Sequence, residues 1–266
     1  MAGPMSLWRA IFPSLGRSLL WVALLTMGVV VLAVSVEKAD QGWTTVWMAI
    51  RFQVVAALLW LSPLIVATSV SLSGLHRHRR GEEQALATAG IGWPHLIPVV
   101  IVVGLSLGVL GLAVGEWLLP VVADPRLPGW VWTATGPVRT ADGLQIAIDL
   151  GGALQFVEQV DATEALPRVA STTALFGSDG AGVVTELYAR AARVPACVGG
   201  ACFGLVAGRC RHPLIVVVAS MGVMTVVEAV AWGMAAQSQL APWVGGGLPA
   251  LLWIFPTILC LRQSST

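Results

Sequence analysis

Long apolar runs constrain this chain more than any other feature of its sequence. A helix that crosses a membrane needs about 20 mostly apolar residues, and six stretches qualify: residues 19–36, 52–73, 96–122, 191–208, 214–236 and 243–261. Only 11% of the residues are charged, whereas a soluble domain carries about 25%. The sequence therefore predicts a polytopic α-helical membrane protein with six transmembrane helices, and it excludes a soluble globular enzyme and a disordered chain.

A polar region of the chain separates the third apolar run from the fourth. Residues 131–135, 144–149 and 153–160 have the composition of short strands, and Asp142–Gly143 is a turn signal. We therefore expect residues 123–184 to form a small β-rich insert. Residues 1–122 would hold transmembrane helices one to three with a short cytoplasmic helix near 82–90, and residues 185–266 would hold helices four to six, in a 3+3 arrangement.

The distribution of basic residues predicts the orientation in the membrane. Most of them stand in alternate short segments beside the apolar runs: Arg9, Arg17, Arg77, Arg79, Arg80, Arg209, Arg211 and Arg262. Such segments face the cytoplasm, so we expect both termini inside and the insert outside. The first apolar run exceeds the roughly 7–15 apolar residues of a signal peptide. We interpret it as an uncleaved anchor, preceded by a short interfacial helix that Pro13 interrupts.

Motifs for nucleotide hydrolysis and for catalysis are absent from the sequence. A phosphate-binding loop ends in Lys followed by Ser or Thr, but the single lysine, Lys38, precedes Ala39. Neither Gly-x-Ser-x-Gly nor His-Glu-x-x-His occurs, and His76 and His78 would point to different faces of a helix. We expect no catalytic residue, no metal, no bound cofactor and, at a net charge of +1, no nucleic-acid partner. The four cysteines lie in or beside apolar runs, which favours buried thiols.

A cytoplasmic segment after the second run holds a candidate docking site. Residues 82–89 predict a short helix that ends at Gly90, with Leu86 on the same face as Glu82. The residues alone leave two interpretations open, a plain interfacial turn and a docking helix for a cytoplasmic partner.

Charged residues within the apolar runs are further candidates. Glu228 lies in the middle of the fifth run, where a carboxyl group is costly. It either makes a polar contact in a cavity or forms a hydrogen bond between helices. Glu186, Arg190 and Arg193 follow the i, i+4, i+7 spacing of one helix face. This spacing favours a Glu186–Arg190 pair, and the alternative is that Arg190 or Arg193 meets an anionic headgroup.

Two further patterns concern packing. Glu116 and Trp117 come one turn before Pro120, and an interface position is the simpler interpretation because aromatic residues gather at the membrane surface. The spacing Gly200-x-x-x-Gly204 permits close contact with another helix.

Four short blocks of residues resemble those of a known family. The blocks are Pro63 with Arg80, Glu82, Leu86, Gly90 and Ile91; Gly115, Glu116 and Trp117 with Pro120; Tyr188 and Arg190 with Pro195; and Pro242, Pro249, Leu261 and Arg262. Their order and spacing, with the 3+3 arrangement, resemble the LptF/LptG permease family, the membrane subunits of the lipopolysaccharide exporter. Because the insert of that family is a β-jellyroll, the resemblance implies a shortened, jellyroll-like periplasmic domain here.

The resemblance also implies a function and partners. The chain would be the permease subunit of an ABC-type transporter that extracts lipopolysaccharide or a related lipid from the bacterial inner membrane toward the outer membrane. ATP would be used by a separate cytoplasmic ATPase dimer. The further partners would be a second permease subunit, in a homo- or heterodimer, the lipid substrate and a periplasmic bridge protein. The short insert favours one alternative, a non-transporting membrane scaffold or regulatory subunit of such a complex.

Site residues follow from the same resemblance. The ATPase-coupling helix would include Glu82, Leu86 and Gly90, and spans one and five would line the lipid cavity. The candidate substrate-cavity residues are Glu228, Arg190 and Arg193. The structural motif at the outer end of the third span comprises Glu116, Trp117 and Pro120.

Overall fold

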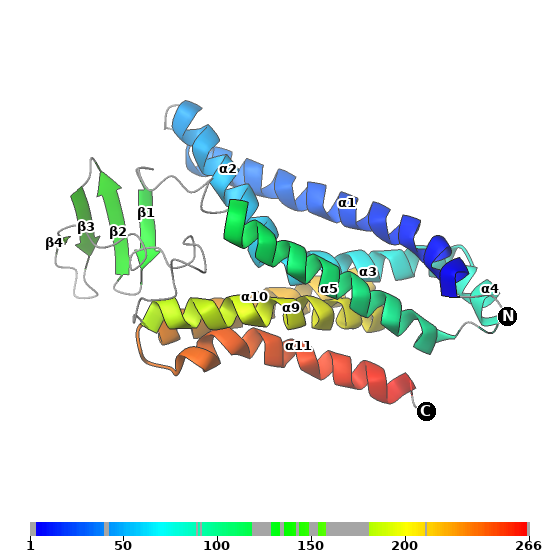
Figure 1. The fold of residues 1–266 in the computed structure, drawn as a ribbon. Coiled ribbons are helices and arrows are strands. Elements are labelled where there is room, and N and C mark those ends of the chain that lie inside the picture. Colours follow the sequence, from blue (N-terminus) through cyan, green and yellow to red (C-terminus); the bar gives the residue numbers. More distant parts are fainter. Residues whose placement is uncertain are drawn as a thin grey trace.

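The computed structural model describes residues 4–39, 43–88, 90, 92–118, 129–133, 136–141, 144–148, 154–157, 181–210 and 212–264. The helices are α1 (Pro4–Glu37), α2 (Trp43–Trp60), α3 (Ser62–Arg79), α4 (Glu82–Thr88), α5 (Ile97–Ala113), α9 (Ala181–Ala207), α10 (Pro213–Ala236) and α11 (Pro242–Ser264). A 3-10 turn, η1 (Trp93–Leu96), precedes α5, and a π-helical turn, η2 (Val114–Leu118), follows it. The long helices lie roughly side by side in an elongated bundle (Figure 1).

The bundle has the composition of a membrane protein. Three segments of the described residues are long and apolar enough to cross a membrane, Ile11–Glu37, Ile97–Leu118 and Pro213–Ala235, with mean hydropathies of 2.6, 2.6 and 2.3. A fourth span results if α2 and α3, which are bent relative to each other, are counted as one. The chain is therefore an α-helical membrane protein, as the apolar runs predicted.

The first helix is longer than we expected. It runs without interruption from Pro4 to Glu37 with Pro13 inside it, so the prediction that Pro13 interrupts a short interfacial helix before the span is wrong. The Pro13 side chain is exposed, whereas Ile11 and Leu15 on either side of it are buried. Packing on both sides of the proline holds the helix together although one backbone hydrogen bond is lost.

The second apolar run bends between α2 and α3, although residues 52–73 predicted one continuous helix. The two helices diverge by 65° at a break between Trp60 and Ser62. Pro63 stands in the first turn of α3 and has no N–H to donate to the carbonyl of Leu59. The hydroxyl of Ser62 donates to that carbonyl instead, at 2.8 Å. The proline thus removes one backbone hydrogen bond at the bend, and the serine hydroxyl replaces it.

The core of the bundle surrounds α9. One apolar cluster joins residues of α1, α3, α5 and α9: Leu15, Val66, Val70, Ile97, Val100, Val103, Ala201 and Leu205. Glycines bring the backbones together. A methyl group on Gly104 of α5 would lie 2.7 Å from the Cα of Val198, and one on Gly200 of α9 would lie 2.6 Å from the carbonyl oxygen of Pro63. Gly204 is equally tight against Ala67, so the predicted close contact at Gly200-x-x-x-Gly204 is confirmed, with α3 as the neighbour.

Helix α9 begins earlier than the fourth apolar run suggested. It starts at Ala181, so residues 181–184, which we expected in the insert, belong to a helix. The hydroxyl of Thr185 donates to the carbonyl of Ala181 at 2.7 Å, and Val183 is buried. Burial of this first turn outweighs the low helix propensity of Gly182, which is buried inside the helix.

Four short strands form one antiparallel sheet in the order β1-β2-β3-β4. They are β1 (Gly129–Thr133), β2 (Gly136–Ala141), β3 (Leu144–Ile148) and β4 (Leu154–Val157). Arg139 of β2 stands opposite Trp130 of β1 and Ile146 of β3. The sheet lies at one end of the bundle, and the start of α1, helix α4 and the end of α11 lie at the other end (Figure 1). The predicted turn at Asp142–Gly143 and the motif residues Ile91 and Pro120 lie outside the described residues.

Candidate functional site

A charged face of α9 is buried inside the bundle. Glu186, Arg190 and Arg193 lie along this face and are only 3%, 7% and 8% exposed. The Nε–H of Arg190 donates to Oε1 of Glu186 at 3.2 Å, which confirms the pair that the i, i+4 spacing predicted. Charged side chains are rarely buried to this extent unless they have partners, so this face is the first place to look for a functional site.

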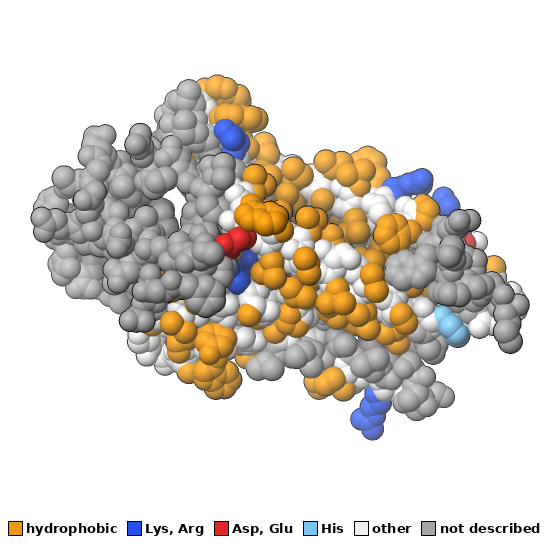
Figure 2. All heavy atoms as spheres, viewed as in Figure 1, with side chains coloured by type: hydrophobic (Ala, Val, Ile, Leu, Met, Phe, Trp, Pro, Cys, Tyr) orange, Lys and Arg blue, Asp and Glu red, His pale blue; other side chains and the backbone are white. Residues whose placement is uncertain are grey.

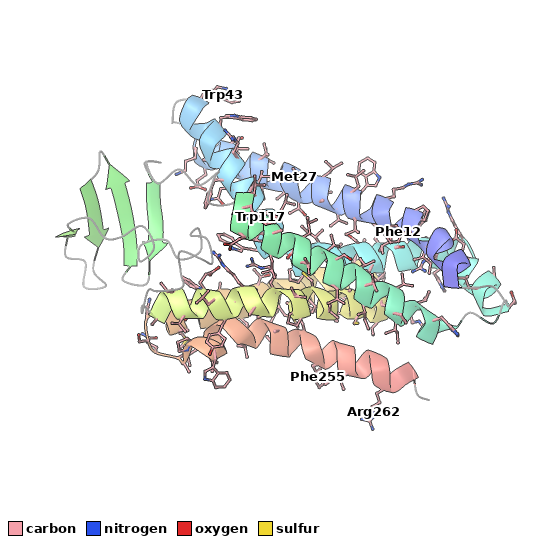
Figure 3. The ribbon with its side chains drawn as sticks, in the orientation of Figure 1. Phe12, Met27, Trp43, Trp117, Phe255 and Arg262 are labelled. Carbon is pink, nitrogen blue, oxygen red and sulfur yellow. The ribbon has the colours of Figure 1, made fainter. Side chains whose placement is uncertain are left out.

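A second carboxylate reaches Arg190 from another helix. Nη1 of Arg190 lies 3.6 Å from Oε2 of Glu116, whose side chain is 27% exposed. Glu116 belongs to the π-helical turn η2 at the end of α5, and such wider turns often occur at functional positions. Its neighbour Trp117 is exposed at the end of α5 (Figure 3). Glu116, which we expected to be an interface residue, therefore also belongs to the charged cluster.

Arg193 lies one helical turn beyond Arg190, beside the bend of the second run. A methyl group built on Gly111 of α5 would lie 3.8 Å from Cδ of Arg193 and 3.8 Å from Oγ of Ser62. One turn further, Sγ of Cys197 lies 3.5 Å from Oγ of Ser62. The polar face of α9 thus continues to the bend and places Arg193 between α5, α9 and the bend.

Glu228 of α10 completes the cluster. Its side chain is half-buried, and the charges of Glu186 and Glu228 both act on Arg193. The candidate cavity residues Arg190 and Arg193 therefore lie on one buried face of α9 with Glu186, and the charge of Glu228 on α10 acts on Arg193. Sequence reasoning missed the link between Glu116 and Arg190, because the two residues stand in separate blocks.

Figure 2 shows an acidic and a basic side chain next to each other on one face of the molecule, with hydrophobic side chains beside them. Arginines held in such a setting can bind a carboxylate or a phosphate group with two parallel hydrogen bonds. The arrangement can therefore either join helices through ion pairs or hold an anionic group.

The three cysteines whose side chains the structure describes divide into two kinds. Cys197 and Cys202 are buried in α9, as predicted, but Cys210 is exposed. Cys210 follows the end of α9 in the turn toward α10, and connections of this type run over the surface because their backbone groups need partners.

The predicted cytoplasmic helix is present as α4. It spans Glu82–Thr88, and Gly81 and Gly90 flank it with φ angles of 70° and 76°, which glycine adopts far more easily than other residues. Nη1 of Arg80 lies 3.8 Å from Oε1 of Glu82 across the first glycine, and Leu86 is half-buried. The helix is confirmed, and its role in docking stays a prediction.

Comparisons with known proteins close the description of the site. No protein-family model matches this chain, and no match was found among the curated proteins. The function is therefore argued from the fold, from the charged cluster and from the sequence blocks.

Proposed function

We propose that this chain is the permease subunit of an ABC-type transporter that extracts lipopolysaccharide or a related lipid from the inner membrane. A separate cytoplasmic ATPase would drive the transport, because this sequence has no phosphate-binding loop. The four blocks that resemble the LptF/LptG permeases support the proposal. The observation that carries it is the position of α4 at the same end of the bundle as both chain ends, opposite the sheet (Figure 1).

Helix α4 has the properties of a docking element for the ATPase. It is short, two glycines with positive φ angles flank it, and Gln84 and Thr88 are exposed on its surface. A helix held between two tight turns can be moved as a unit and can transmit that motion to α3, which precedes it. Glu82, Leu86 and Gly90 would form its contact with the ATPase dimer.

Helices α1 and α10 support a lipid pathway. Only 6% of the apolar segment of α1 and 12% of that of α10 are buried within the chain, against 39% for α5. In the proposed order these helices are spans one and five, which the resemblance assigns to the lipid cavity. Their exposed apolar faces suit lipid and a second permease subunit.

Six spans and an orientation belong to the same proposal. Helices α9 and α11 would be the fourth and sixth spans, and α2 with α3 the second. The start of α1 and the end of α11 lie at the same end of the bundle (Figure 1), which fits an even number of crossings. The arginines beside α3, α9 and α11 support a cytoplasmic position for that end, and the sheet would form a small periplasmic domain that meets a bridge protein.

Copurification tests the proposal. The tagged chain, expressed in its own host and extracted in detergent, should bring down a nucleotide-binding subunit that mass spectrometry identifies, together with a second permease subunit. Reconstituted into vesicles that contain lipopolysaccharide, the complex should hydrolyse ATP faster than in vesicles without it. The combined variant Glu82→Arg and Gln84→Arg should lose the ATPase because it reverses and adds charge on α4.

A matched control adds the same charge elsewhere. Gln239→Arg lies in the exposed turn between α10 and α11 and should retain the ATPase. If the α4 variant keeps the ATPase as well as the control does, the docking assignment is wrong. A complex that assembles but shows no stimulation by lipid supports the scaffold alternative instead of transport.

A further inference from the structure

Helix α2 carries an exposed stripe of two tryptophans and an arginine. Trp43, Trp47 and Arg51 follow one another at intervals of four residues, which places them on one helix face. Trp43 and Trp47 are 76% and 52% exposed, and Arg51 is exposed as well. Side chains of these kinds favour the boundary between hydrocarbon and water, where their polar ends reach the headgroups.

Contacts on other faces of α2 hold it at the sheet end of the bundle. Val46 and Ile50 are buried against Val34 near the end of α1. Toward the bend, Leu59 is buried, and a methyl group built on Gly115 would lie 3.3 Å from its Cδ2. Packing near both ends of the helix therefore fixes the orientation of the exposed stripe.

The bend between α2 and α3 limits how the two helices fit into a bilayer. Each has 18 residues, so a straight pair would extend about 54 Å, more than the roughly 40–45 Å of a bilayer with its headgroups. Because the helices diverge by 65°, α2 adds only about 11 Å along the direction of α3, and the pair spans about 38 Å. Helix α3 thus makes most of the crossing, and α2 runs obliquely at the sheet end (Figure 1).

The same tilt keeps the exposed stripe at one depth. Trp43 and Arg51 are about 12 Å apart along the helix, but at 65° to α3 they differ by only about 5 Å in depth. The headgroup layer of one leaflet is about 5–7 Å thick, so the whole stripe fits within it. Trp117 of η2 is also exposed and lies at the same end of the bundle as Trp43 (Figure 3), as in an aromatic belt.

We propose that α2 is an interfacial helix that lies obliquely in the leaflet next to the sheet, with Trp43, Trp47 and Arg51 among the phospholipid headgroups. The indole rings lie at the boundary with the hydrocarbon, and the guanidinium group binds headgroup phosphates. The proposal needs only the membrane character of the helices, so its outcome is independent of the transport function.

Depth measurements on the full chain in phospholipid vesicles test the tilt. Cys210 and Cys260 are first replaced by serine, and the two buried cysteines of α9 stay in place. Ala49→Cys and Ala57→Cys, at half-buried positions of α2, then each carry a fluorescent label that is quenched by lipids with spin labels at different depths. The two labels should differ by about 5 Å in depth, against about 12 Å for an upright helix.

Helix α10 provides the matched control. Val218 and Val226 are exposed and are also eight residues apart, and α10 is one of the long helices of the bundle (Figure 1). Labels on Val218→Cys and Val226→Cys should differ by about 12 Å in depth. If the two α2 labels differ as much, α2 stands upright and the proposal is wrong. Labels on α2 that no lipid quenches would place it outside the bilayer, which would also overturn the proposal.

The label on Ala49→Cys also tests Arg51 as an anchor. Arg51→Leu should move this label deeper by about 3 Å, because acyl chains then cover a part of α2 where the charge had kept headgroups and water. Arg51→Lys should keep the depth, since an ammonium group also binds phosphate. The control Arg17→Leu, at an exposed position of α1, should leave it unchanged. No shift in Arg51→Leu, or an equal shift in Arg17→Leu, would exclude Arg51 as the anchor.

Discussion

Helices α9 and α10 are adjacent in the sequence but differ in opposite ways in charge and in burial. Helix α9 carries three charged residues on one face and is buried on nearly every side, whereas α10 is among the most apolar segments and is mostly exposed. In a soluble protein the apolar helix would be inside. The reversal shows that the surrounding solvent is lipid, so that polar groups gather where protein, and not lipid, is their neighbour.

The comparison also separates two kinds of packing. Small residues let α9 approach α3, α5 and α11 at backbone distance. Gly199, Gly200 and Gly204 of α9 lie against carbonyl groups of α11 and α3, and Gly104 of α5 lies against the backbone of α9. Gly222 and Gly233 of α10 have open space around them. Helix α9 is therefore the centre of the bundle, whereas α10 has an exposed apolar face that can meet a partner.

Of the variants considered, Arg190→Leu should lower the free energy of unfolding most. It leaves the carboxylates of Glu186 and Glu116 without their shared cation, and losing one member of a buried ion pair costs about 3–5 kcal/mol. Unfolding in mixed micelles titrated with sodium dodecyl sulfate measures the loss. Arg17→Leu on exposed α1 should change the free energy of unfolding by less than about 0.5 kcal/mol. Equal losses in the two variants would contradict the structural role of Arg190.

A comparison of Gly204→Leu with Gly222→Leu tests the difference in packing between α9 and α10. The first forces a large side chain against the backbone of Ala67 and should cost about 3 kcal/mol, since overpacking a tight contact displaces backbone. The second adds a side chain in open space on α10 and should leave the protein at least as stable, because leucine favours a helix. Thermal unfolding in detergent compares the two, and a milder effect at position 204 than at 222 would reject the asymmetry.

Ser62→Ala should cost less, about 1–2 kcal/mol. It removes the hydroxyl that donates to the Leu59 carbonyl at the bend and leaves that buried acceptor without its donor. Ser106→Ala removes the same type of bond, to the carbonyl of Val102 on α5, but from an exposed position, and should have almost no effect. Unfolding titrations of both variants check the difference, and a comparable loss at Ser106 would show that burial is not its cause.

Val226→Ala should have the smallest effect on the isolated chain. Val226 is exposed on α10, so its truncation leaves no cavity and should change the free energy of unfolding by less than about 0.5 kcal/mol. The same variant should reduce recovery of the second permease subunit in copurification if α10 faces that partner. A stability loss above 1 kcal/mol, roughly that of a buried aliphatic truncation, would place Val226 in the core.

Local patterns explain what the sequence could predict. The helix near α10 was predicted closely because its apolar run is continuous, and the Glu186–Arg190 pair and the short helix at α4 depend on spacings within a few residues. The bend was missed because a proline near the middle of an apolar run does not reveal whether the helix continues. The hydrogen bond from the Ser62 hydroxyl to the Leu59 carbonyl, which accompanies the bend, can be seen only in the folded structure.

Longer-range features were out of reach for a different reason. The ion pair between Glu116 and Arg190 joins two helices that the chain alone does not pair, and the sequence offered only their membership in separate blocks. The different surroundings of Arg190 and Arg193 depend on which helices pack around α9. Neighbouring residues of one type on one helix face look alike in a sequence, although their partners among the described residues differ.

Biosynthesis gives the charged cluster a further consequence. As a proposed span, α9 carries two arginines, and each costs about 2.5–3.5 kcal/mol when inserted near the middle of a bilayer. Glu186 enters with α9, and Glu116 on η2 precedes it along the chain, so Arg190 has its carboxylates as soon as α9 leaves the ribosome. Glu228 comes later, with α10. The nascent chain should therefore keep α9 beside the insertion machinery until α10 has been made.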